Sequence, residues 1–292
     1  MHLFAGTVVQ GLVRGCVIAL LAGGITIVYR STRVLNFAQG GLATFNTYLY
    51  YQFAVTWSWP AAAALPIVLV IAAIVGVFAE LVAVRPLVHA DPQSRSVGTI
   101  GLLLIIQWAV ISIWGSQLRF LPSLSSAGLT IGGVRITAQD FAIALATIVV
   151  GGGVAFVLGR SRAGLALAAV AQDPDAARLL GVGPRAVSVG TFALASVMGA
   201  IAGILATPLL VLNPFQMTLV FVIALGAALA GGFESIGRTI GAGLILGVIQ
   251  SLVGTYVPVS GLPQAAGFLA VLVVLVVARR RGNLVDLLRG TA

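Results

Sequence analysis

The sequence contains no lysine, and all sixteen of its basic residues are arginines. A phosphate-binding loop of the GxxxxGK(S/T) type requires a lysine, and so does catalysis through a Schiff base. The chain can therefore contain neither kind of site. If ATP drives this protein, another subunit must hydrolyse it.

Residues that bind metals or act as nucleophiles are also scarce. Cys16 is the only cysteine, and His2 and His89 are the only histidines. A single thiol excludes an intrachain disulfide and a thiolate cluster, and two histidines far apart do not make a metal site. We expect Cys16 to be a small packing residue, and we find no motif that supports an enzyme active site.

Charged residues make up only 8% of the chain, whereas 60% of residues are hydrophobic, and the mean hydropathy is +1.12. A soluble domain of 292 residues needs far more charge to cover its surface. We therefore predict an all-α polytopic membrane protein with one transmembrane domain over residues 1–292. At about 20 residues per span, the uncharged runs give about nine crossings, in a range of about eight to ten. The predicted spans are 7–29, two in 34–79, 96–118, 141–159, two in 186–233 and two in 239–278, the last pair parted at 258–263.

The arginines predict the orientation of these spans. With the N-terminus outside, thirteen arginines fall in inner loops or the C-terminal tail, and only Arg119 and Arg135 fall outside. Cytoplasmic loops carry the excess of arginine in membrane proteins, so we expect the N-terminus outside and the C-terminus in the cytoplasm. Residues 115–139 then form the longest outer loop. The net charge of +9 faces anionic lipid and partner proteins, not nucleic acid.

A polar segment at 159–185 separates very apolar runs and carries four arginines and two aspartates. Its composition predicts a helix over 163–172 and a second, shorter helix over 174–180. Asp173 is the predicted N-cap of the second helix, with Pro174 at the first helical position and Asp175 in the first turn. This helix would expose Arg178 and end at Gly181, with Leu179 and Leu180 adding apolar surface. The segment is either a docking element for another protein or a solvated connector.

Three stretches resemble permease subunits of branched-chain amino acid ABC importers. Residues 162–181, RAGLALAAVAQDPDAARLLG, are similar to the cytoplasmic loop that docks on the ATP-binding subunit in that family. Residues 29–41, YRSTRVLNFAQGG, resemble the pattern after the first long helix, with Gln39 in place of the usual histidine and Gly41 in place of the usual acid. Residues 230–247, AGGFESIGRTIGAGLILG, resemble the glycine-rich late segment. The resemblance covers nearly the whole chain.

The resemblance implies a transport subunit in the plasma (inner) membrane of a prokaryote. Its partners would be a second homologous permease subunit, two ATP-binding subunits and an extracytoplasmic solute-binding protein. ATP and Mg would be bound by the ATPase subunits, with no cofactor in this chain. The solute would be small and polar, either a branched-chain amino acid or a related compound. The residues that would couple to the ATPase are Asp173, Pro174, Asp175, Arg178 and Leu179.

Several amide and hydroxyl side chains fall inside the predicted spans. Asn36 and Gln39 lie three residues apart and share a helix face, and Thr44 and Asn46 extend this polar string. Unpaired amides are costly in lipid, so these four residues should face the bundle interior. They either form hydrogen bonds between helices or line the translocation path. Gln107 and Gln250 are isolated in sequence and favour structural roles.

Charged residues near the spans bear on two other classes of protein, a secondary transporter and a membrane enzyme. Arg14 lies within the first apolar run, where it snorkels to the surface, pairs with a partner's acid or binds a substrate carboxylate. Glu80 is expected to pair with Arg85 near the inner surface, and Glu234 with Arg238. An ion-coupled secondary transporter would need a carboxylate at mid-span, which the sequence does not offer. An integral membrane enzyme would need a catalytic cluster.

Glycine is abundant, with 36 residues in a sequence of mainly helical character. Small residues four positions apart allow the backbones of membrane helices to approach closely. We expect close helix packing at four such pairs: Gly11/Gly15, Gly199/Gly203, Gly237/Gly241 and Gly243/Gly247.

Overall fold

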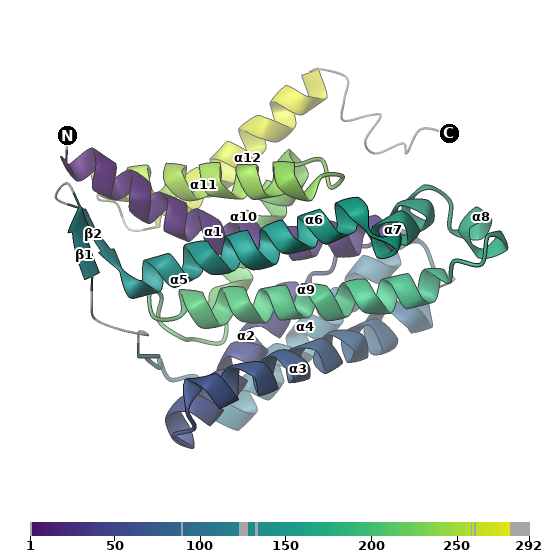
Figure 1. Cartoon of the computed structure of the whole chain (residues 1–292), viewed down its shortest axis with the longest axis horizontal. Helices are drawn as coiled ribbons and strands as arrows, with labels where there is room; N and C mark the ends of the chain where they lie inside the picture. Colours follow the sequence, from purple (N-terminus) through teal and green to yellow (C-terminus); the bar gives the residue numbers. More distant parts are fainter. Residues whose placement is uncertain are drawn as a thin grey trace.

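The computed structural model describes residues 2–88, 90–122, 128–131, 134–257, 259 and 261–280. His89, the 258–263 boundary at positions 258 and 260, and the arginines at 281 and 289 lie outside the described residues. Helices form nearly all of the described chain (Figure 1). In order, the elements are α1 His2–Thr32, α2 Ala38–Tyr51, η1 Gln52–Thr56, α3 Ala61–Ala79, η2 Glu80–Val84, η3 Arg85–Leu87, α4 Pro92–Trp114, β1 Gly128–Ile131, β2 Val134–Thr137, α5 Ala138–Ala146, η4 Thr147–Gly152, α6 Gly153–Arg160, α7 Arg162–Gln172, α8 Pro174–Leu179, α9 Pro184–Ala206, α10 Gln216–Ala230, α11 Ile236–Tyr256 and α12 Leu262–Arg280.

The helices lie where the sequence predicts spans, which confirms the all-α membrane fold. In the described part of the chain, six helical stretches are long and apolar enough to cross a membrane. They are Phe4–Thr32, Ala61–Leu87, Gln93–Trp114, Ala138–Arg160, Pro184–Ala206 and Ile236–Tyr256. The other predicted spans correspond to α2, which continues into the π-helix η1, to α10 with 15 residues, and to α12 with 19 residues. The total of about nine crossings stays a prediction.

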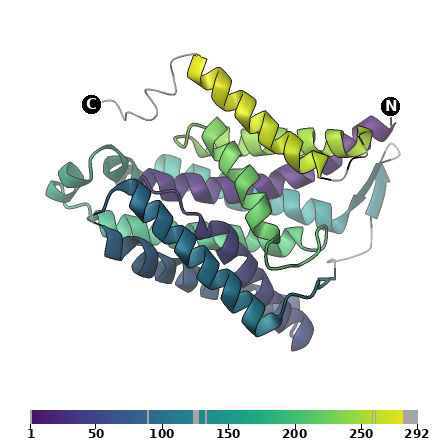
Figure 2. The same ribbon diagram turned by 180° about the vertical axis from the view of Figure 1, so that it is seen from behind.

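Helix α1 is the centre of the bundle. In its most apolar 18-residue window 89% of the residues are buried, against 17% in the Ala138–Arg160 stretch, so α1 is enclosed and α5–α6 lies outside. α1 packs most extensively against α11 and α9, and then against α10. Seen from behind, α10 and α12 cross over α11 and α1 on the opposite face from α3 and α9 (Figure 2). The largest apolar core accordingly runs along α1, with Leu20, Leu21 and Ile25 almost fully buried.

Two of the glycine pairs bring α1 and α11 into direct backbone contact. A Cβ on Gly15 would lie 2.7 Å from Leu244 Cα, one on Gly243 would lie 2.8 Å from Ala19 Cα, and one on Gly247 would collide with Gly15. Close packing of Gly11/Gly15 against Gly243/Gly247 is therefore confirmed.

The other two glycine pairs, Gly199/Gly203 and Gly237/Gly241, differ in whether they make a close helix contact. Gly203 packs against Thr47 and Ala43 of α2, as expected for a helix contact. The prediction for Gly237/Gly241 is wrong, because a Cβ on Gly241 would meet no atom within 4 Å. This pair lies at the start of α11, before Gly243 and Gly247, where the helix contacts α1.

The polar loops are divided between two ends of the bundle. The start of α1 and the β1–β2 hairpin lie at one end, and α7 and α8 lie at the other (Figure 1). The hairpin pairs Gly128 with Thr137 and Ile131 with Val134, so part of the expected 115–139 loop is an ordered sheet. Arg119 and Leu212 exchange backbone hydrogen bonds of 3.0 Å, which joins this loop to the α9–α10 connection.

Candidate functional site

Helix α8 has a complete set of local end signals. Asp173 Oδ1 accepts hydrogen bonds from Asp175 N at 2.9 Å and from Ala176 N at 3.0 Å, so it is the N-cap as predicted. At the other end, Gly181 has φ of +81°. Gly181 N donates to Arg178 O at 3.0 Å, and Val182 N donates to Ala177 O at 2.9 Å. These two bonds form a Schellman motif, so both ends of this six-residue helix are fixed.

The outward face of α8 combines two leucines with an ion pair. Leu179 is 91% exposed and Leu180 is 81% exposed, which is unusual for apolar side chains in a polar loop. Arg178 Nη1 lies 2.9 Å from Asp175 Oδ1, and both side chains are largely exposed. Ala177, on the inward face, is buried. The helix therefore offers a firm apolar and charged surface at the tip of the bundle.

Helix α7 connects α8 to the central helix. Its Leu167 and Val170 are buried, and Leu167 belongs to the main apolar core. Arg33, just after α1, donates from Nη2 to Ala171 O at 2.9 Å. Gly164 allows the tight α6–α7 turn, because a Cβ there would collide with the Leu158 carbonyl. Helix α7 therefore contacts both α8 and α1.

The polar cluster of Asn36, Gln39, Thr44 and Asn46 is buried in the bundle, with each residue at most 2% exposed. Gln39 Nε2 donates to Ala195 O of α9 at 2.8 Å and Gln39 Oε1 lies 3.5 Å from Asn36 Nδ2. Asn46 Nδ2 donates to the Ser196 hydroxyl, also on α9, at 3.3 Å.

The cluster thus contains two hydrogen bonds between α2 and α9, one bond inside α2, and one from Asn36, which precedes α2, to Gln39. Thr44 donates to Gly40 O of its own helix at 3.0 Å. Asn36 Oδ1 and Asn46 Oδ1 are buried without a hydrogen-bond partner among the described residues. None of the four residues lines the cavity described next, and their role in a translocation path stays a prediction.

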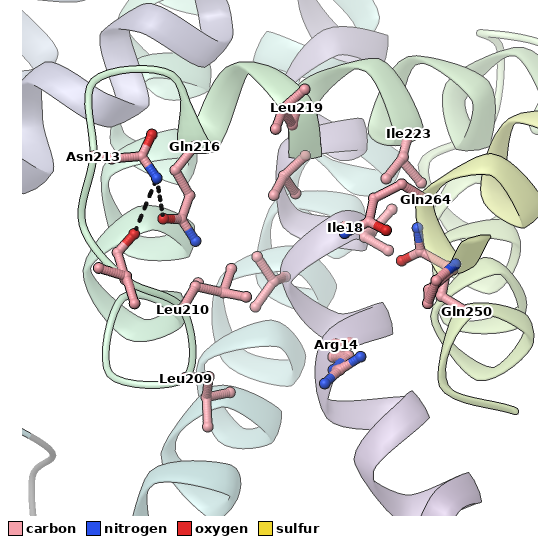
Figure 3. Close-up of a pocket in the computed structure, with 15 residues that line it drawn as sticks. Arg14, Ile18, Leu209, Leu210, Asn213, Gln216, Leu219, Ile223, Gln250 and Gln264 are labelled. Carbon is pink, nitrogen blue, oxygen red and sulfur yellow. Dashed lines mark hydrogen bonds between the residues drawn. The ribbon is translucent and has the colours of Figure 1, made fainter. Parts of the chain in front are cut away.

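A cavity of about 450 Å³ lies between α1, the α9–α10 connection, α10, α11 and α12 (Figure 3). Arg14 reaches it from α1, and the Gln250 and Gln264 side chains lie together on its α11–α12 side. Asn213 and Gln216 lie on the opposite side, joined by an Nδ2–Oε1 hydrogen bond of 3.1 Å. The remaining wall is aliphatic: Val17, Ile18, Ala206, Leu209, Leu210, Val211, Leu219, Val220, Ile223 and Pro263. We call this space the Arg14 cavity.

Three amides of the Arg14 cavity, Asn213, Gln216 and Gln264, have no sequence signal that singles them out. Gln250 is not isolated, as its spacing in the sequence suggested, because it faces the same space as Arg14 and Gln264. Their approach comes from helix packing across more than 230 residues, which no local pattern encodes. Gln107 does have a structural contact, since its Nε2 donates to the Thr218 hydroxyl at 3.2 Å.

One of the two ion pairs predicted for acidic residues near the spans is wrong. Glu80 does not pair with Arg85 at the surface: it is 4% exposed, and its Oε1 accepts a hydrogen bond from the Ser188 hydroxyl of α9 at 3.2 Å. It begins the π-helix η2, whose wider turn rotates the end of α3 relative to an α-helix. Glu80 Oε2 has no partner among the described residues. The predicted pair of Glu234 and Arg238 is present, at 3.4 Å.

Known proteins of similar sequence cover almost all of this chain. The family described as "Branched-chain amino acid transport system / permease component" matches residues 7–278. The high-affinity branched-chain amino acid transport system permease protein LivH of Salmonella typhimurium is 30% identical over 91% of both chains. BraD of Pseudomonas aeruginosa, named in the same way, is 28% identical over 83% of this chain and 84% of its own length. A probable LivH of Methanocaldococcus jannaschii is 25% identical over 82% of this chain and 78% of its own length. No solved structure matches significantly.

Proposed function

Because this chain belongs to the family of permease components of branched-chain amino acid transport systems, we propose that it forms the solute path of an ATP-driven importer. It is a multi-pass membrane protein and a transport subunit, not an enzyme. Its partners in the proposed importer are a second homologous permease, two ATP-binding subunits that hold ATP and Mg, and an extracytoplasmic solute-binding protein.

The exposed surface of α8 is the observation that carries this proposal. A six-residue helix with both ends capped and two adjacent leucines in water is suited to insertion into a groove of another protein. The route from α8 through α7 to Arg33 and α1 would pass movement of that protein into the bundle. The absence of lysine supports a separate ATPase, because this chain cannot form a phosphate-binding loop.

In the proposed cycle, ATP binding closes the two ATPase subunits and moves α8 with them. The bundle responds as a rigid body and opens its path toward the binding protein, which releases its solute. Hydrolysis and product release restore the inward-open state. The binding protein selects the solute, which we propose to be a branched-chain or closely related amino acid.

Variants of α8 test this coupling. Ala177→Pro removes the 3.0 Å bond from Ala177 N to Asp173 O and costs roughly 3 kcal/mol of local helix stability. Arg178→Glu and Leu179→Asp alter only exposed surface. We expect all three to reach the membrane and bind loaded binding protein normally, but to lose stimulated ATP hydrolysis and uptake in the reconstituted complex.

The matched control for these variants is Arg85→Glu, a charge reversal at an exposed arginine outside the 159–185 segment, which should leave stimulation unchanged. Wild-type stimulation in the three α8 variants would show that the segment is a connector. ATP turnover by this chain purified alone would contradict the whole assignment of ATP hydrolysis to partners.

We propose that the end of the bundle bearing α8 is cytoplasmic and that the end bearing the N-terminus faces outward, in a prokaryotic plasma membrane. A cysteine at the exposed Ser116, which follows α4, would report on the outer loop. In a Cys16→Ala background, Ser116→Cys should react with an impermeant thiol reagent in intact cells. Ala176→Cys should react only after the membrane is opened, and the reverse pattern would invert the orientation.

Ion-coupled secondary transport is the second candidate, and buried Glu80 is the observation that favours it. A carboxyl group with one unpartnered oxygen inside the bundle could exchange a proton during transport. The two mechanisms separate in cells, because collapse of the proton gradient at constant ATP would stop a secondary transporter and spare an ATP-driven importer. We expect uptake to persist under these conditions.

A further inference from the structure

Arg14 places a fixed positive charge inside the membrane-spanning part of α1. It lies ten residues after Phe4, or about 15 Å along the helix axis. A guanidinium at this depth needs water, an acid or a bound anion. Among the described residues Arg14 forms no ion pair and no hydrogen bond, and the described lining of its cavity contains no aspartate or glutamate. The chain thus supplies a cation without its counter-charge.

The polar and apolar groups of the Arg14 cavity specify a class of ligand. A guanidinium binds a carboxylate through two parallel hydrogen bonds, and the Gln250 and Gln264 amides can accept hydrogen bonds from an ammonium group. Much of the remaining wall is aliphatic, with Ile18, Leu219 and Ile223 among its residues, and the described lining has no aromatic ring. The volume of about 450 Å³ is within the range of small-molecule sites. A small amino acid with a branched aliphatic side chain matches all three features.

The Gln250 amide is buried and lies close to α12. It is 8% exposed, yet it makes no hydrogen bond with any described residue. A Cβ on Gly267 of α12 would lie 2.8 Å from Gln250 Nε2, so glycine at this position leaves the room that the amide occupies. A buried amide without a hydrogen-bond partner among the described residues is available to a ligand.

The cavity lies toward the end of the bundle that holds the N-terminus, away from α8. The α9–α10 connection, which forms one wall through Leu209, Leu210 and Asn213, is joined to the loop after α4 by the Arg119–Leu212 bonds. In the proposed orientation this end faces the solute-binding protein. A solute leaving that protein would meet this cavity before it reached the centre of the bundle.

We propose that the Arg14 cavity is a transient binding site for the aliphatic amino acid during import. Arg14 binds the carboxylate of the solute, Gln250 and Gln264 bind its ammonium group, and the aliphatic wall takes its side chain. This site rests on the proposed function, because it assumes that the chain conducts an amino acid. It gives the permease its own recognition of the solute, in addition to that of the binding protein.

The test uses the full complex reconstituted in liposomes with loaded binding protein, L-leucine as the solute and uptake per ATP hydrolysed as the readout. Arg14→Ala should lower this ratio about 10- to 100-fold, as expected for loss of a charge-assisted hydrogen bond, and Arg14→Lys should restore part of it. Gln250→Leu keeps the volume and should lower the ratio less. Gln107→Leu, a matched change at a buried amide outside the cavity, should leave the ratio unchanged.

A second arm measures occupancy directly and does not depend on transport. A leucine analogue with a diazirine on its side chain should label Ile18, Leu219 or Ile223 in the complex held in lipid nanodiscs. L-leucine should compete with this labelling, whereas isoamylamine, which lacks the carboxylate, should not. Arg14→Ala should abolish the competed labelling.

The outcomes separate failure of the site from failure of the proposed function. Wild-type uptake per ATP in both Arg14→Ala and Gln250→Leu would overturn the site and leave the importer intact. Loss of the second permease from the purified Arg14→Ala complex would also overturn it, because Arg14 would then pair with an acid of that subunit. Absence of leucine uptake by the wild-type complex would contradict the proposed function. The labelling arm would still decide whether a carboxylate ligand occupies the cavity.

Discussion

The polar cluster on α2 and the Arg14 cavity both place amide side chains among membrane helices, but they differ in how those amides are bound. In the polar cluster, Gln39 and Asn46 donate hydrogen bonds to Ala195 O and to the Ser196 hydroxyl of α9. In the Arg14 cavity, Gln250 and Gln264 face open space and a cation. An amide inside a membrane protein can therefore join two helices or remain available to a ligand. Its hydrogen-bond partners distinguish the two roles.

The Arg14 cavity is bounded by α1 and α11, which meet in a close backbone contact at Gly11, Gly15, Gly243 and Gly247, here called the α1–α11 seam. Gly247→Leu would drive a side chain into the backbone of Gly15 and separate α1 from α11. We expect loss of folded protein, since overpacking at a backbone contact cannot relax locally. Gly241→Leu, in the same helix but with no atom within 4 Å of its Cβ position, should remain folded. The measurement is the monodisperse fraction after extraction, and equal recovery of both variants would show that the seam is loose.

We also expect water to reach the Arg14 cavity but not the polar cluster. In a Cys16→Ala background, Gln264→Cys should react with a small hydrophilic thiol reagent at least about tenfold faster than Asn46→Cys, because thiol reactivity follows exposure. Asn46 is fully buried, whereas Gln264 lines the cavity. The reaction is followed in nanodiscs, where both membrane faces are open to the reagent. Similar rates at the two positions would mean that the polar cluster is wet and belongs to the path.

The smallest expected difference is in stability. Gln39→Leu removes the 2.8 Å bond to Ala195 O and should lower the free energy of unfolding by about 1–3 kcal/mol. Gln264→Leu removes no hydrogen bond and should change it by less than about 0.5 kcal/mol. The apparent melting temperatures in one detergent give the order of the two variants. A larger loss for Gln264→Leu would reverse the assignment of structural and ligand-binding amides.

Local sequence signals predicted the helices and the ends of α8. Asp173, Pro174 and Gly181 act through bonds within a few residues, so their roles can be derived without tertiary structure. The hairpin at 128–137 also has such a signal, two glycines between alternating apolar residues, which the prediction of one 115–139 loop does not use.

The remaining features depend on how helices rotate and pack. Glu80 lies near the end of an apolar run, and its burial follows from the π-helical turn and from Ser188, 108 residues away. The neighbours of Arg14 come from four other segments of the chain. No pattern in a single helix specifies such contacts, so the coupling element was predictable and the cavity was not.

The α1–α11 seam also has a consequence for biosynthesis. α11 ends at Tyr256, so more than 200 residues follow α1 before its main packing partner is complete. At roughly 5–20 residues per second, this interval is about 10–45 s. During that time the glycine face of α1 has no α11 to pack against. The helix that is most enclosed in the folded bundle therefore lacks its main packing partner for much of synthesis. We expect chaperones or the insertion machinery to bind α1 during this interval.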